Sequence, residues 1–168
     1  KMVGYDEKYA FLSRHEKTRM ANEGDIDEAL DKEEKDMIHS IFAFGETTAE
    51  EIMVPRINIR AIDITTDYAT TLNVINEEAH SRIPVFKGTI DTIVGILYTK
   101  DVLSWISQNT PEEWTLETLI KKPHFVPAGK KIDDLLAELK NKQVHLAIVV
   151  DEYGGTAGIV TMEDILEE

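Results

Sequence analysis

One hydroxyl side chain and one carboxylate near the C-terminus have a spacing that suits ligand binding. Thr161 follows the apolar run Gly158-Ile159-Val160, and Asp164 comes three positions later. A hydroxyl where a strand becomes a helix can cap that helix, and the exposed N–H groups there can receive an anion such as phosphate. An aspartate at the third helical position can accept hydrogen bonds from paired hydroxyls, as in ribose. The spacing therefore suggests nucleotide binding, with simple helix capping as the alternative.

The same layout occurs once more, earlier in the chain. The run Gly95-Ile96-Leu97 reaches the hydroxyl residue Tyr98, and Asp101 follows three positions later, so that equivalent residues of the two copies are 63 positions apart. Two copies of this length are too few for a repeat array and instead predict a pseudo-two-fold pair. In such a pair each half can bury its sheet against the other, and a ligand would lie in the crevice between them.

Each copy has the order β-α-β-β-α, which predicts a mixed α/β fold with two sheets. In the first copy the apolar patterns and turn residues predict strands at 60–64, 81–86 and 92–98, a helix from the cap Asp67 to Ala79, and a helix opened by Lys100-Asp101. In the second copy they predict a short helix ending at 119–120, strands at 124–126, 146–150 and 157–161, and a helix at 131–141. The polar, proline-containing residues 107–114 connect the copies.

The residues before the repeats predict an acidic helical connector. Residues 1 to about 31 are charged and only loosely patterned, whereas Met37, Ile38, Ile41 and Phe42 fall on one face of a helix that Gly45 can cap. A capping box at Thr48 then opens a short helix that Val54-Pro55 ends. We therefore divide the chain into a connector at 1–45, a first repeat at 46–107 and a second repeat at 115–168.

Composition limits the classes of function. The chain has 168 residues, of which 42% are hydrophobic and 30% are charged, and its formal net charge is −14. This charge would repel nucleic acid, which we exclude as a partner. The chain contains no cysteine and no apolar run of the roughly 18 residues that a membrane span needs. We expect an excised fragment, because the chain begins at Lys1 and its final predicted helix stops after two turns at Glu168.

The sequence lacks the common catalytic motifs. It has no cysteine nucleophile, no Gly-x-Ser-x-Gly elbow and no histidine pair at helical ligand spacing. Gly154-Gly155 favours a hairpin turn, because the lysine and hydroxyl of a phosphate-binding loop are absent. These observations indicate a binding module without catalytic residues or metal ligands, and not an enzyme.

Residues 46–168 resemble a tandem pair of cystathionine-β-synthase (CBS) domains, also called a Bateman module. Several blocks are similar to the CorC/HlyC group of hemolysin-related proteins, which itself resembles the eukaryotic cyclin M metal transport mediators. The blocks are residues 51–56, 79–85, 95–101 and 147–155, followed by 158–168. Residues 24–38 also resemble the acidic connector that precedes the CBS pair in that group.

The resemblance implies a regulatory function. In the family a transmembrane domain precedes the pair, so the chain would be the cytosolic regulatory part of a magnesium or cobalt export protein, at the cytoplasmic face of the inner (plasma) membrane. It would bind ATP or AMP, with Mg²⁺ and ATP as the expected combination, and it would form a homodimer and act on the membrane domain of the same protein. The alternative is a structural dimerisation platform with no bound nucleotide.

The resemblance also assigns roles to individual residues. Thr161 would contact phosphate and Asp164 would hold the ribose hydroxyls, unless the two merely cap the last helix. The first repeat would complete the cleft: Met53 and Val54 would line the base pocket, and His80, Arg82, Ile83 and Pro84 would border it. Arg82 could pair with phosphate or form a surface salt bridge. The histidines could equally be packing residues, and Met53, Ile83 and Pro84 would be core in either case.

The first copy departs from the family pattern at Tyr98. This residue replaces the small hydroxyl, and its ring could fill the space that a phosphate needs. A second cleft around Tyr98, Asp101 and His145, which is equivalent to Arg82, is therefore expected to be degenerate, and we predict one occupied cleft.

Overall fold

The computed structural model describes residues 32–168, with only the backbone course given for residues 34 and 35. The chain divides into two compact units, residues 1–46 and 47–168, and each is described by itself. In the first unit, helix α2 (Lys32–Glu46) confirms the predicted connector helix, but Gly45 lies inside its last turn and is not its cap. Met37 and Ile41 on α2 are 66% and 64% exposed. The expected lead-in at residues 1–31 lies outside the described residues.

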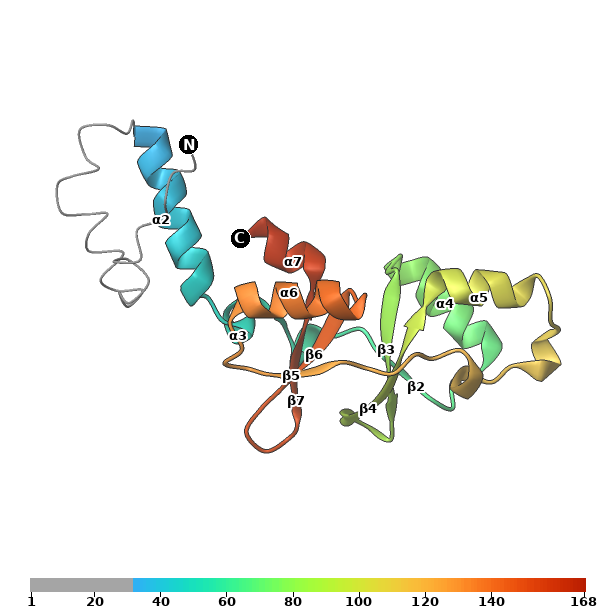
Figure 1. The fold of residues 1–168 in the computed structure, drawn as a ribbon. Coiled ribbons are helices and arrows are strands. Elements are labelled where there is room, and N and C mark those ends of the chain that lie inside the picture. Colours follow the sequence, from blue (N-terminus) through green and yellow to red (C-terminus); the bar gives the residue numbers. More distant parts are fainter. Residues whose placement is uncertain (1–31) are drawn as a thin grey trace. The chain divides into compact units, whose positions relative to one another are not determined.

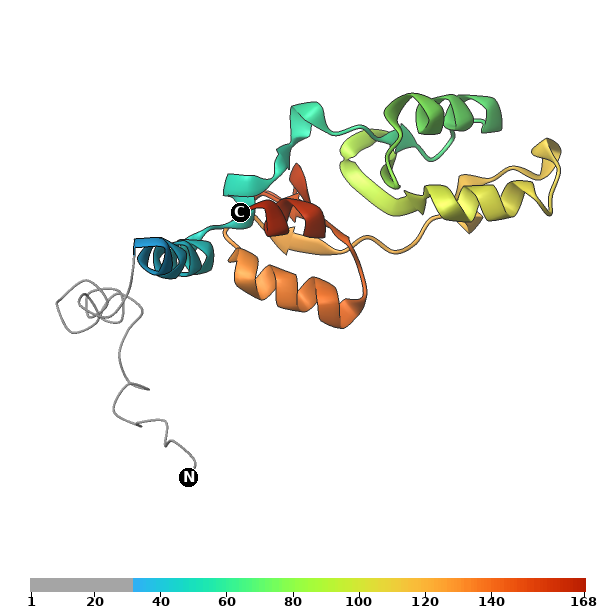
Figure 2. The ribbon, with the colours of Figure 1, turned by 90° about the horizontal axis from the view of Figure 1, so that it is seen from above.

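The second unit contains a three-stranded sheet built by the first repeat (Figure 1). Its strands are β2 (Ile62–Asp63), β3 (Arg82–Lys87) and β4 (Thr89–Tyr98), with β2 parallel and β4 antiparallel to β3. Gly88, at φ 76°, makes the tight turn between β3 and β4. Helices α4 (Tyr68–Glu78) and α5 (Thr99–Ile106) lie side by side in both ribbon views (Figure 2). Asp67 caps α4 as predicted, because its side chain accepts a hydrogen bond from Thr70 N.

The second repeat builds a four-stranded sheet of order β1-β7-β6-β5. Three strands come from the repeat itself: β5 (Phe125–Pro127), β6 (Leu146–Val150) and β7 (Thr156–Thr161). Helices α6 (Ile132–Lys142) and α7 (Met162–Glu167) contact each other beside this sheet. β5 runs parallel to β6, and β7 runs antiparallel to β6. The first sheet has the same pattern, with β2 parallel and β4 antiparallel to β3. This correspondence confirms the predicted repeat.

The fourth strand of that sheet was not predicted from the sequence. The capping box at Thr48 opens helix α3 (Ala49–Ile52), with Thr48 N donating to Glu51 Oε2 at 2.6 Å. Val54 and Pro55, which we expected only to end this helix, form strand β1 and pair with β7 of the other repeat. A matching exchange occurs in the opposite direction, because Lys121, near the start of the second repeat, pairs with Ile96 of β4. Each sheet thus receives a segment from the start of the other repeat.

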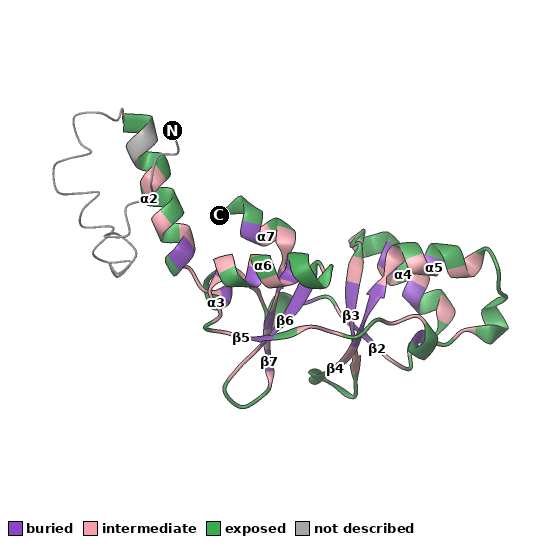
Figure 3. Ribbon diagram, in the orientation of Figure 1, coloured by how far each residue is buried: buried purple, intermediate pink, exposed green. Residues whose placement is uncertain are grey.

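Buried apolar residues join the two sheets. Ile93 and Ile96 of β4 form one core cluster with Leu146 and Ile148 of β6, which confirms that the repeats bury their sheets against each other. Figure 3 shows that buried positions concentrate on β3, β4, β6 and β7. A second cluster lies beneath α4 and α5 in the first repeat and includes Ile83.

Several element boundaries differ from the sequence prediction. The strand expected at 60–64 is reduced to β2 and follows a short 3₁₀ turn, η2 (Arg56–Asn58), while β4 begins at Thr89. The helix expected before 119–120 is a 3₁₀ turn, η4 (Leu116–Thr118), and the polar connection contains another, η3 (Pro111–Glu113). Among residues 32–168, no helix combines the length and the apolar character that crossing a membrane requires.

Candidate functional site

The junction of β7 and α7 holds Thr161 and Asp164 in a reciprocal cap. Thr161 N and Thr161 Oγ1 both donate to Asp164 Oδ2 at 2.7 Å, and Asp164 N donates back to Thr161 Oγ1 at 3.2 Å. A threonine N-cap with an acid at the third helical position satisfies N–H groups that the helix leaves free. The alternative of a structural cap is therefore real. The cap uses one carboxylate oxygen, and among residues 32–168 no hydrogen bond reaches Asp164 Oδ1.

A cavity of about 500 Å³ opens beside this junction. Its walls come from both repeats, and its size lies in the range typical of small-molecule sites. The first repeat contributes Val54, Asn58, Arg60, Ala79, His80, Ser81, Arg82 and Pro84, and the second contributes Leu146, Ile159, Thr161, Glu163 and Asp164. The structure therefore brings together six of the residues predicted from the sequence: Val54, His80, Arg82, Pro84, Thr161 and Asp164.

Arg82 is the most buried cation in this cavity wall. Its side chain is 18% exposed, and its Nη1 lies 3.5 Å from Glu163 Oε1, a long contact for an ion pair. Its Nε is buried and has no hydrogen-bond partner among the described residues. A buried guanidinium N–H without an acceptor is energetically unfavourable. The long Nη1 contact and the place of Arg82 in the cavity wall leave its guanidinium able to bind an acceptor from a ligand.

Glu163 is the acidic side chain that contacts this guanidinium in the cavity wall. Burial alone would raise the pKa of Glu163, but its own backbone N–H, the Arg82 charge and the Thr161 hydroxyl together hold that pKa below its usual value. The carboxylate is consequently charged at neutral pH and neutralises part of the Arg82 charge. Any anion that enters the cavity would compete with Glu163 for Arg82.

Two predicted residues do not line this cavity. Ile83 is only 1% exposed and belongs to the core cluster of the first repeat. Met53 lies against Gly158, where an added Cβ would come within 2.5 Å of Met53 Sδ. Each residue directly precedes a cavity-lining neighbour, Pro84 or Val54, and is not itself part of the lining.

Sequence reasoning missed several other residues of the cavity wall. Asn58 and Arg60 reach it because β1 crosses to β7, and two residues carry too little periodicity to predict that pairing. Leu146 and Ile159 stand 63 positions after Ile83 and Ile96, so the repeat offset was a usable signal for them. Glu163 adjoins Asp164 and was given no role from the sequence.

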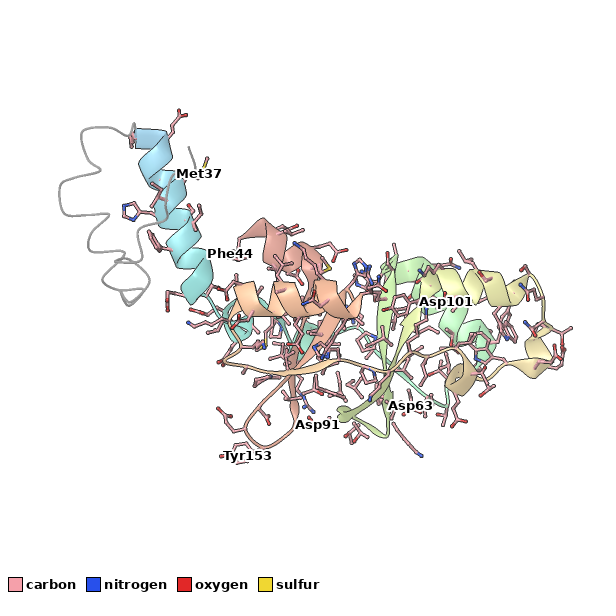
Figure 4. All side chains as sticks on the ribbon, in the orientation of Figure 1. Met37, Phe44, Asp63, Asp91, Asp101 and Tyr153 are labelled. Carbon is pink, nitrogen blue, oxygen red and sulfur yellow. The ribbon has the colours of Figure 1, made fainter. Side chains whose placement is uncertain are left out.

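The predicted degenerate cleft of the first repeat differs in its contacts. A cavity of about 470 Å³ reaches Tyr98 and His145, but Asp101 does not line it. Asp101 Oδ2 instead lies 2.7 Å from Lys121 Nζ, which also sits 4.5 Å from the centre of the Tyr98 ring. The hydrogen bond to Asp101 raises the pKa of Lys121. Figure 4 shows Asp101 on α5.

The two cavities share the wall formed by residues 79–82. Within residues 32–168, no group of three or more histidine, aspartate or glutamate side chains is arranged to hold a metal ion. The Thr161 cavity offers a carboxylate acceptor, a guanidinium that is 18% exposed and apolar walls.

Comparison with known proteins agrees with this architecture. The family model described as "CBS domain" matches residues 49–108 and 116–168. Hemolysin C of Brachyspira hyodysenteriae is 40% identical over 140 residues, which cover 83% of this chain and 51% of that protein. The magnesium and cobalt efflux protein CorC of Vibrio cholerae is 34% identical over 155 residues, which cover 92% of this chain and 53% of that protein. The chain spans about half the length of these relatives.

Solved structures give the same result. The CBS domain of a bacterial CNNM/CorC family Mg²⁺ transporter superposes with a TM-score of 0.79 at 38% identity, covering 94% of this chain and 95% of that one. A structure of such a CBS domain in complex with ATP superposes with a TM-score of 0.75 at 41% identity, covering 80% and 95% of the two chains. The chain therefore belongs to the CBS-domain family, as a tandem pair of the kind found in hemolysin-related CorC and CNNM proteins.

Proposed function

We propose that this CBS pair binds an adenine nucleotide, with MgATP as the expected form, in the cavity between Thr161 and Arg82. One observation carries the proposal: the cavity is lined both by a carboxylate with a free oxygen, Asp164 Oδ1, and by the guanidinium of Arg82, whose Nη1 makes only a long 3.5 Å contact with Glu163. The first group suits a hydroxyl donor and the second suits an anion. A similar CBS domain has been solved in complex with ATP, which supports the same choice of ligand.

Asp164 would hold the ribose. Its Oδ2 remains in the helix cap, where Thr161 N and Oγ1 keep the carboxylate in place. Oδ1 then accepts hydrogen bonds from the ribose hydroxyls, and bonds to a charged acceptor are stronger than neutral ones. Capping and ligand binding are in this way two uses of one carboxylate and do not exclude each other.

Arg82 and Thr161 would bind the phosphates. The guanidinium can exchange its 3.5 Å contact with Glu163 for a shorter, charge-assisted pair with a phosphate oxygen. The Thr161 hydroxyl, which donates to Asp164 in the described structure, would turn to donate to a phosphate, while Thr161 N keeps the cap closed. His80, whose side chain is 55% exposed at the cavity wall, adds a further donor.

Apolar side chains would enclose the base. Val54 and Ile159 are cross-strand partners in the β1–β7 pair, and both line the cavity together with Pro84 and Leu146. These four side chains provide apolar walls of the kind that small-molecule pockets use. Mg²⁺ retains several waters and binds through one or two carboxylates plus substrate phosphates, so it would arrive on the triphosphate.

Nucleotide binding would regulate a membrane protein. The ligand can act only through a difference in its affinity for two arrangements of the pair. We propose that this pair forms a homodimer, that it belongs to a magnesium or cobalt transport protein at the cytoplasmic face of the membrane, and that residues 1–45 relay the preference to the membrane domain. One curated relative is named as a magnesium and cobalt efflux protein.

Calorimetric titration with ATP, ADP and AMP, each with and without Mg²⁺, tests the proposal. We expect saturable binding of one nucleotide per chain, and a shift of the sedimentation profile if the ligand favours a dimer. Absence of heat and of a thermal shift with every nucleotide would reject nucleotide binding. Dimerisation that is unchanged under those conditions would then favour the structural platform.

A further inference from the structure

The segments exchanged between the repeats place two different side chains at equivalent positions. Val54 pairs with Ile159 of β7, and Lys121 pairs with Ile96 of β4. Ile96 and Ile159 are equivalent residues of the two repeats, 63 positions apart. The preceding residues match as well, because a Cβ on Gly158 would meet Met53 and a Cβ on Gly95 would meet Ile120. Lys121 therefore takes the position beside β4 that Val54 takes beside β7, although the cavity of about 470 Å³ at Tyr98 is lined by neither Lys121 nor Asp101.

Lys121 occupies the groups that a ligand of the first-repeat cleft would need. Asp101, the counterpart of Asp164, has Oδ2 at 2.7 Å from Lys121 Nζ. The face of the Tyr98 ring, at the position of Thr161, has the same ammonium 4.5 Å from its centre. The backbone holds Lys121 there firmly, since Lys121 N and O exchange two hydrogen bonds of 2.9 Å with Ile96.

In the Thr161 cleft, no lysine or arginine of the described residues pairs with the equivalent carboxylate of Asp164. Val54 is apolar and lines the cavity, and Asp164 Oδ1 has no hydrogen-bond partner among those residues. The two aspartates have the same place in the repeat. The Asp101 carboxylate forms an ion pair with Lys121, whereas Asp164 lines the Thr161 cavity.

We infer that Lys121 is a specificity-determining residue of the first repeat, an internal cation that pairs with Asp101, lies over the Tyr98 ring and so limits the pair to one nucleotide per chain. This inference rests on the proposed function. It attributes the expected loss of a second nucleotide site to the charge of Lys121 as well as to the bulk of Tyr98. While the ion pair persists, a ribose hydroxyl would have to compete with the Lys121 ammonium for the Asp101 carboxylate.

Calorimetric stoichiometry with MgATP tests the inference in a common Tyr98→Thr background. Tyr98→Thr alone should still bind one nucleotide per chain, because Lys121 continues to hold Asp101. Adding Lys121→Met, which keeps the methylene stem and removes the charge, should raise the stoichiometry from one to two. Adding Lys121→Arg, which preserves an ion pair, should leave it at one.

A reciprocal experiment moves the lysine into the Thr161 cleft. Val54→Lys should pair with Asp164 and weaken MgATP binding by about 30-fold or more. Val54→Met has a similar length and no charge, so it measures the cost of bulk, and its loss should be about tenfold smaller. Circular dichroism checks that both Val54 variants fold. If the Val54 variants do not fold, the Lys121 variants still test the inference, because the Lys121 side chain is 54% exposed in the wild type.

The outcomes separate the two proposals. A wild-type chain that binds no nucleotide overturns the proposed function, and this inference with it. A wild-type chain that binds one nucleotide, while Tyr98→Thr with Lys121→Met also binds one, overturns the lysine assignment alone. Two nucleotides on Tyr98→Thr without a change at Lys121, or on the wild type, would do the same.

Discussion

At the end of β7, Thr161 and Asp164 hydrogen-bond to each other. At the end of β4, Tyr98 caps α5 without a side-chain hydrogen bond, and Asp101 pairs with Lys121. The backbones of the two junctions correspond, with a strand leading into a helix and an aspartate at its third position in each. The difference lies in a few side chains. Repetition of a fold therefore does not duplicate a site, and function has to be argued from the side chains of each copy.

The largest expected effect separates the two aspartates. Asp164→Ala should weaken MgATP binding by about 100-fold, because hydrogen bonds to a charged group contribute about 1.5–3 kcal/mol each. Asp101→Ala should change it by no more than about twofold, since an exposed ion pair is worth about 1 kcal/mol or less and we expect no nucleotide in this cleft. Calorimetry on the two variants and the wild type makes the comparison.

A second substitution distinguishes ribose binding from capping. Asp164→Asn keeps an oxygen that can accept from Thr161 N, so the helix cap should survive with a loss below about 1 kcal/mol. It removes the charge that the ribose hydroxyls would use, so binding should fall nearly as far as in Asp164→Ala. Equal affinity in Asp164→Asn and the wild type would show that only the cap matters.

A second prediction concerns the glycines at which the exchanged segments cross. A Cβ on Gly158 would lie 2.6 Å from the backbone oxygen of Val54, which belongs to the β1–β7 pair. Gly158→Ala should therefore reduce the free energy of unfolding by about 2 kcal/mol, which lowers Tm by about 4–8 °C, and should also weaken nucleotide binding. Gly95→Ala meets the Ile120 side chain and should lower Tm without changing nucleotide affinity.

Gly129→Ala provides the matched control, because an added Cβ there has no atom within 4 Å. Its Tm should stay within about 2 °C of the wild type, an effect below about 1 kcal/mol. If Gly158→Ala lowers affinity no more than Gly129→Ala does, β1 has no part in positioning the cleft.

These comparisons also indicate what the sequence could predict. The repeat offset and the alternating apolar runs predicted both sheets, and the Thr161–Asp164 spacing predicted a cap and a cavity that the structure places together. The role of Lys121 was not predictable in this way. It lies in the polar run Lys121-Lys122 without periodicity, and it stands 67 residues after Val54, so the 63-residue offset does not align the two. Only the pairing with Ile96 reveals the equivalence.

A third, smaller effect concerns the pH dependence of stability in the helices. Two lysines, Lys142 and Lys130, hydrogen-bond Glu138 on α6 and lower its pKa from 4.5 to about 2. Its contribution to stability is therefore fully present above about pH 4.5 and is lost as pH falls through about 2. On α4, the equivalent position 63 residues earlier is Ile75, which is buried and cannot titrate.

Denaturant titrations of the wild type and Glu138→Gln between pH 6 and pH 2.5 measure this contribution. After allowance for solvent screening, we expect the wild type to be more stable by about 1 kcal/mol at pH 6, with the difference shrinking toward pH 2.5. Glu112→Gln, at an exposed position with no ion pair among the described residues, is the control. A difference that does not vary with pH would exclude the ion pairs as its cause.

The smallest expected effect concerns the second residue of the helix that follows each strand, which is Glu163 in α7 and Lys100 in α5. Glu163 contacts Arg82 in the Thr161 cleft, while Lys100 stands at the same place in the first repeat, so the local charge is inverted. If Glu163 competes with phosphate for Arg82, Glu163→Gln should strengthen MgATP binding by about threefold, the range of a partly exposed ion pair. Titration with adenosine should show no gain, because adenosine has no phosphate for Arg82 to bind. Equal gains in affinity for ATP and adenosine would show that Glu163 affects binding of the nucleoside. They would contradict the proposal that Arg82 binds the phosphates.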